Sequence, residues 1–199
     1  MISETQNLSV FAVVVPVLLS QNEYCVYDSE LDAFLPKIFA ILEQSLNLGT
    51  SQVQTESKMA IKTSFEVLSE YANALSPFLL AEIENLLYLI QKVNLNDIGI
   101  TGKALNLLKA LLNYRIENFE CYVKMNEFAI KYISLETPFL ATLSCDYFNI
   151  VCYKSPKSVL SILNILIKKL VNVIPFTDEM IKLVLEEQED FDNKKQQFD

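Results

Sequence analysis

The feature that most constrains this chain is a series of apolar stripes with helical spacing. In the first, over 31–48, apolar residues recur three and four positions apart, which places them on one side of a helix. Comparable segments follow at 58–75, 78–93, 102–118, 121–133, 137–151, 159–173 and 177–185. Short polar breaks separate them, and helices joined by short loops lie antiparallel. The sequence therefore predicts an all-α chain of helical hairpins.

Two architectures fit these stripes. Similar segment openings recur about every 40 residues, as in HEAT and armadillo arrays. They fall at Phe34-Leu35, Phe78-Leu79, Tyr122-Val123 and Val159-Leu160. This period favours an α-solenoid of HEAT-like antiparallel hairpins over a compact multi-helix bundle, which remains the alternative. We expect one domain over 1–185 and an acidic, disordered tail over 186–199.

Local signals predict where individual helices begin and which residues face inward. Pro77, Pro138 and Pro156 are each expected in a first helical turn. Ser57 and Thr101 are expected to cap the second and fourth segments. Met59 is expected to face inward in the second segment, as are five residues of the seventh: Leu160, Leu163, Leu166, Ile167 and Leu170.

The charge and residue types exclude several functions. A net charge of −9 repels phosphate backbones and anionic membranes, so we expect basic protein segments as partners rather than nucleic acid. The chain has no histidine, which removes the Ser/His and Cys/His catalytic pairs and the commonest zinc ligand. We therefore expect no enzymatic activity, cofactor or metal. The apolar run over 8–19, at about twelve residues, is too short to span a bilayer, so no membrane insertion is expected.

The four cysteines, Cys25, Cys121, Cys145 and Cys152, form no C-x-x-C pair. Cys145 and Cys152 are expected on one apolar helix face. Reduced core cysteines are typical of a cytosolic or nuclear protein.

The acidic tail contains the main candidate site. Its residues are Glu186, Glu187, Glu189, Asp190, Phe191 and Asp192. The acids would attract a basic segment while the ring docks; the alternative is that they only favour solubility. Glu82 and Glu84 point in different directions on a helix, so we expect a solvated face rather than an acid–base pair.

Four tyrosines are expected near loops and partly exposed. They are Tyr24, Tyr27, Tyr147 and Tyr153.

Three stretches resemble HEAT repeats of the importin-β (karyopherin-β) family, nearest its importin-5 and importin-4 branches. They are FLPKIFAILEQSL, KMAIKTSFEVLSEYANALSPFLLAEIENLLYLIQKV and GKALNLLKALLNY. The resemblance implies a nuclear transport receptor, or a fragment or reduced form of one. Its inner helices would form a concave acidic surface for basic cargo or Ran GTPase, in cytoplasm and nucleus.

Two other hypotheses remain open. The chain could be a structural scaffold or adaptor subunit of a larger complex, without a transport role. It could also be an enzyme of an unrecognised helical family, which would require a polar cavity.

Overall fold

The computed structural model describes residues 33–47, 54–93 and 97–173, and every regular element in these ranges is helical. The all-α prediction is confirmed. The elements are α3 (Leu35–Asn47), α4 (Gln54–Asn73), α5 (Pro77–Ala81), α6 (Ile83–Gln91), α7 (Ile98–Leu111), α8 (Phe119–Ala129), the 3-10 turn η1 (Ile130–Tyr132), α9 (Pro138–Lys154), α10 (Pro156–Leu160) and α11 (Leu163–Val173). The expected segment at 177–185 lies outside the described residues.

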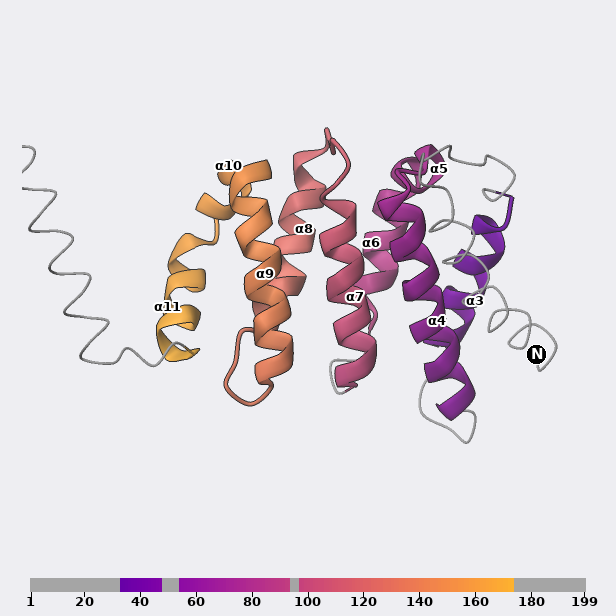
Figure 1. Ribbon diagram of the computed structural model, residues 1–199, viewed down its shortest axis with the longest axis horizontal. Helices are drawn as coiled ribbons and strands as arrows, with labels where there is room; N and C mark the ends of the chain where they lie inside the picture. The colour runs from indigo at the N-terminus through magenta and orange to yellow at the C-terminus, as the bar shows by residue number, and fades with distance from the viewer. Residues whose placement is uncertain (1–32, 48–53, 94–96, 174–199) are drawn as a thin grey trace, which may run out of the picture.

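The helices lie in two rows (Figure 1). In one row, α4 packs against α7 and α7 packs against α9. In the other, α3 contacts α6, α6 contacts α8, and α8 contacts α10. Contacts of α3 with α4 and of α8 with α9 join the rows, and α3 and α11 lie toward opposite ends of the described stack.

The proline starts are confirmed at α5, α9 and α10. At α5, the Ser76 hydroxyl also accepts a hydrogen bond from the Leu79 amide at 3.2 Å. The turn before it is closed by Tyr114, whose hydroxyl donates to the carbonyl of Ser76 at 3.0 Å. The first of these bonds satisfies an amide that the start of a helix leaves without a partner.

The two predicted caps are wrong. Ser57 lies inside α4, which begins at Gln54, and Thr101 is buried inside α7. Helix α7 begins earlier because Asp97 caps it, accepting the Ile100 amide at 3.0 Å. The helix also ends at Leu111 rather than at 118, and the following turn contributes buried side chains to the core.

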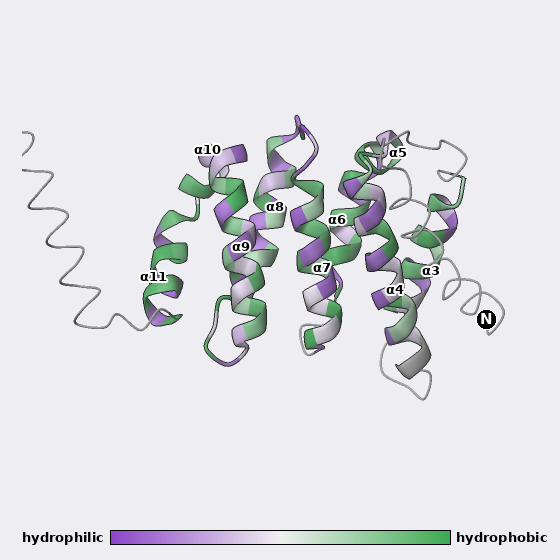
Figure 2. Cartoon of the chain, in the orientation of Figure 1, coloured by the Kyte–Doolittle hydropathy of each residue, from purple (hydrophilic) through white to green (hydrophobic). Residues whose placement is uncertain are grey.

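The core is one continuous cluster that extends from α3 to α11. Figure 2 shows hydrophobic residues on all of its helices. In α4 the buried face includes Ala60 and Ile61, whereas Met59 is 58% exposed. The inward prediction for Met59 is wrong because contacts with α3 and α7 fix which side of α4 is buried.

The prediction also fails for much of the seventh segment. Leu166 is buried and Leu170 is partly buried, but Leu160, Leu163 and Ile167 are exposed. Helix α11 lies at the end of the described stack, so only one of its sides is packed against neighbouring helices.

A buried hydrogen-bond chain joins α8, α9 and α10. The Tyr147 hydroxyl donates to Asn126 Oδ1 at 2.8 Å, and Asn126 Nδ2 donates to Ser158 Oγ at 3.1 Å. Tyr147 is fully buried, so its predicted exposure is wrong, whereas Tyr153 is exposed as predicted. Tyr24 and Tyr27 lie outside the described residues.

The cysteine prediction holds only in part. Cys121 is buried, Cys145 is half-buried and Cys152 is exposed. The last two lie outside the buried stripe of α9, which includes Tyr147 and Val151. Burial raises the pKa of the Cys121 and Cys145 thiols. Cys25 lies outside the described residues.

Candidate functional site

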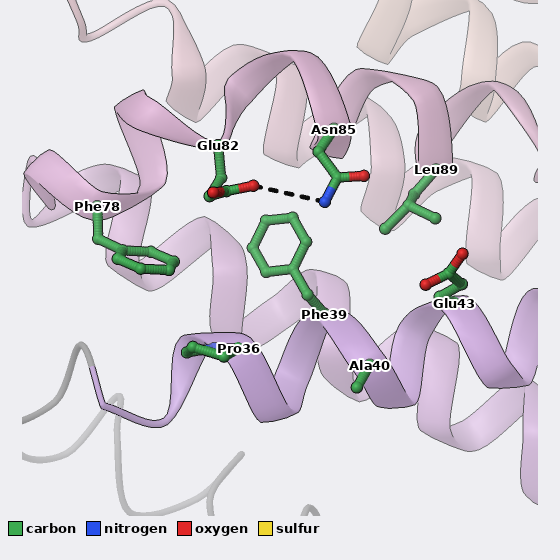
Figure 3. A pocket seen from close by; sticks show the side chains of 8 residues that line it. All are labelled: Pro36, Phe39, Ala40, Glu43, Phe78, Glu82, Asn85 and Leu89. Carbon is green, nitrogen blue, oxygen red and sulfur yellow. Dashed lines mark hydrogen bonds between the residues drawn. The ribbon is translucent and has the colours of Figure 1, made fainter.

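A groove lies between α3 and the α5–α6 pair, with a volume of about 290 Å³ (Figure 3). We call it the α3–α6 groove. Helix α3 contributes Pro36, Phe39, Ala40 and Glu43, and the opposite side contributes Phe78, Glu82, Asn85 and Leu89. Its size is near the lower end for ligand pockets, which suits one or two side chains rather than a large cofactor.

The floor of the groove is apolar because both helices turn core residues toward it. Phe39 is 7% exposed and Leu89 only 1% exposed. Phe78 is half-buried and packs at the edge of the core. An aliphatic or aromatic side chain placed here would lose contact with water, the main source of binding energy for an apolar group.

Glu82 lies at the junction of α5 and α6. Its backbone (φ −94°, ψ 11°) lies outside ordinary helical values, so two short helices replace one long one. Phe78 therefore comes from α5, while Asn85 and Leu89 come from α6. Asn85 Nδ2 donates a long hydrogen bond of 3.4 Å to Glu82 Oε2 at the surface of the groove.

The polar groups of the groove favour a cation. Glu43 and Glu82 approach it from opposite helices, and neither lysine nor arginine is among its lining residues. Glu82 is half-buried, whereas Glu84 is exposed and bonded to Asn118. The two acids diverge as the sequence predicts, but Glu82 belongs to a groove and not to a fully solvated face.

Negative charge is balanced by positive charge in the described part of the chain. The described ranges hold 12 acidic and 13 basic residues, so all of the net charge of −9 comes from residues outside them. Attraction of these helices for a basic segment is therefore local, and the α3–α6 groove offers one such place because two carboxylates and no lysine or arginine line it.

The six tail residues predicted as a site, 186–187 and 189–192, lie outside the described residues. Sequence analysis missed Phe39, Glu43 and Asn85. The spacing of Phe39 and Glu43, one helical turn apart, signals that both can reach the same place. The pairing of α3 with α6 has no comparable local signal.

The described residues bring no three metal-ligating side chains together, and none of their helices is long and apolar enough to cross a membrane. Comparisons of the sequence and structure with protein-family models, curated proteins and solved structures gave no match. The importin-β resemblance thus rests on the sequence stretches that carry it.

Proposed function

We propose that this chain is a protein-binding module built from HEAT-like helical hairpins. Its α3–α6 groove would hold a short segment with an apolar side chain and a neighbouring lysine or arginine. The observation that carries the proposal is that two carboxylates, Glu43 and Glu82, line the groove from opposite helices, beside the buried side chains of Phe39 and Leu89. An aliphatic anchor supplies affinity, and the carboxylates select a cation beside it.

The two rows of helices support the solenoid form of this proposal. Each helix of the α4–α7–α9 row packs against the next one, which is how repeat arrays share a core between neighbours. The α3–α6 groove then lies between successive helices of the other row. Surfaces formed by successive repeats are where such arrays bind extended segments.

A nuclear transport receptor is the more specific form of the proposal, and the sequence resemblance supports it. In this form the bound segment is a basic import signal, and Ran carrying GTP is a second partner. A pull-down of both with the purified chain at low salt tests it. Binding of neither would remove the transport role, in cytoplasm or nucleus, and would leave the groove proposal intact.

The groove itself is tested with two fluorescent peptides that differ only in charge. One alternates leucine with lysine, and the other has glutamate in place of each lysine. We expect the full-length chain to bind the lysine peptide, with affinity that falls as salt rises, and not the glutamate peptide. Binding of both peptides equally would contradict the proposal.

Charge-matched substitutions then locate the binding. Glu43→Gln with Glu82→Gln should weaken lysine-peptide binding by about ten-fold or more, which corresponds to one or two lost charge-assisted contacts. Glu127→Gln with Glu120→Gln makes the same charge change at exposed positions of α8. We expect this control pair to weaken binding by less than about two-fold, because distant exposed charges are screened. Equal losses in both variants would place the peptide elsewhere.

A scaffold subunit is the second candidate function. Its support is the exposed aliphatic side chains of α10 and α11, since such patches mark protein contacts, and it loses that support if the chain's own segment 177–192 covers them. Cross-linking in native extract separates the two functions: a scaffold retains fixed neighbours, while a receptor exchanges them.

A further inference from the structure

The α10–α11 end of the stack carries a second surface, independent of the α3–α6 groove. Four aliphatic side chains form it, at 37% to 66% exposure: Leu160, Leu163, Ile167 and Val171. The last three are four residues apart on α11 and form one stripe. This stripe adjoins the packed side of the helix, so α11 has a wide apolar face of which only part is covered.

The surroundings of this stripe are basic. From 147 to 173 the chain has four lysines and no acidic residue. Lys157 precedes Leu160 by three residues, and Lys168 precedes Val171 by three, so each lies on the same side of its helix as an exposed aliphatic. Lys154 ends α9 nearby, and none of these three lysines pairs with a carboxylate among the described residues.

The fitting occupant is apolar and acidic, and the sequence following α11 has that chemistry. The stretch 177–192, TDEMIKLVLEEQEDFD, places Met180, Ile181 and Val184 at helical spacing and then five acids and Phe191. Pro175, two residues beyond α11, is a helix-ending signal, and a short connection returns a chain antiparallel to its neighbour. A tethered segment also has a millimolar effective concentration, which a separate partner must exceed.

We propose that the exposed stripe of α10–α11 is the docking surface for this chain's own segment 177–192. The aliphatic residues of the segment cover the stripe, and its acids pair with Lys154, Lys157 and Lys168. A consequence is that the six acidic residues of the predicted tail site bind within the chain. A basic partner then has to displace the lysines to reach them.

Zero-length carbodiimide cross-linking of the full-length chain tests the pairing. An equimolar mixture of unlabelled and ¹⁵N-labelled chains, at sub-micromolar concentration, distinguishes bonds within a chain from bonds between chains. We expect amide bonds from Lys154, Lys157 or Lys168 to acids of 186–192, within one chain. Bonds between differently labelled chains would assign the surface to a second copy. Equal bonding of these acids to the exposed Lys37 and Lys92 would show no docking. Either result overturns the proposal.

Hydrogen exchange tests the apolar contact separately. In the wild-type chain, amides within 177–192 should exchange at least ten-fold more slowly than in the variant Leu163→Ser with Ile167→Ser. The control variant, Met59→Ser with Tyr88→Ser, changes two exposed apolar residues on other helices and should leave that protection unchanged. Wild-type amides of 177–192 that exchange at random-coil rates would overturn the proposal. So would protection of α11 only on adding phosphatidylserine vesicles, since a membrane would then be the occupant.

Discussion

Helices α7 and α11 have similar Leu- and Ile-rich sequences but lie in different surroundings. Helix α7 is packed between α4 and α9, and nine of its residues are buried, whereas α11 has one buried residue. The same kind of apolar stripe is thus buried in the centre of the stack and partly exposed at its end. The comparison teaches that an apolar pattern predicts a helix, while neighbours decide how much of its surface is covered.

The largest difference is expected from truncating one apolar residue in each helix. Leu108 is fully buried in α7, so Leu108→Ala should lower the free energy of unfolding by about 2–5 kcal/mol. Ile165 is 54% exposed on the side of α11 away from the stripe, and Ile165→Ala should cost less than about 0.5 kcal/mol. Urea unfolding measures both changes in the free energy of unfolding. Equal losses would contradict the claim that α7 is more deeply packed than α11.

A second prediction concerns the buried hydrogen bonds that connect Tyr147, Asn126 and Ser158 and so join α10 to α8 and α9. Asn126→Ala removes the partner of the Tyr147 hydroxyl and the donor to Ser158, and should cost about 2 kcal/mol. Asn113 makes a 3.4 Å bond to Asn73 at the surface, so Asn113→Ala should cost less than about 0.5 kcal/mol. Thermal unfolding compares them. If Asn126→Ala left the thermal stability unchanged, these hydrogen bonds would not be what holds α10 against its neighbours.

Alanine substitutions at two glycines of α7 test how tightly this helix packs against α9 and against α4. A Cβ at Gly102 would lie 2.9 Å from Phe139 Cε1 of α9, and one at Gly99 would lie 2.8 Å from Cε of the flexible Lys62 side chain. Alanine in a helix gains about 1 kcal/mol over glycine. We expect Gly99→Ala to keep most of this gain, because the lysine can move aside. Gly102→Ala should lose it, so that unfolding midpoints separate the two variants by about 1 kcal/mol.

The smallest expected effect is the pH dependence of the stability that Asp97 contributes between α4 and α7. Burial alone would raise the pKa of Asp97, but the Ile100 amide and the charges of Lys58 and Lys62 outweigh it and lower the pKa below 3.8. Because the pKa of Asp97 is lower in the folded chain than its ordinary value of 3.8, this carboxyl stabilises the fold above pH 3.8. That stabilisation is lost as the pH falls through the lowered pKa of the folded state.

Asp97→Asn should retain the cap and abolish this dependence, at a cost below about 1 kcal/mol at neutral pH. Unfolding of both proteins across the acidic range measures it. If the two curves remain parallel down to the lowest pH, Asp97 does not supply the effect.

The sequence predicted the helical class and the three proline starts because both depend on residues close together in the chain. It misplaced the start of α7, where Asp97 competes with Thr101 as a cap and gains two lysine partners from α4. It misjudged Met59, Tyr147 and Leu160 because their burial depends on helices distant in sequence. The α3–α6 groove was missed for the same reason: Glu43 and Glu82 line one groove only when α3 packs against α6.

Native-state hydrogen exchange of the full-length chain compares the packing of α7 in the centre of the stack with that of α11 at its end most directly. Amides of α7 are predicted to open only with global unfolding, while those of α11 exchange through local opening at lower free energy. Docking of 177–192 would slow α11 exchange without bringing it to the α7 level, since only part of its face is covered. Exchange from α11 as slow as from α7 would contradict the account.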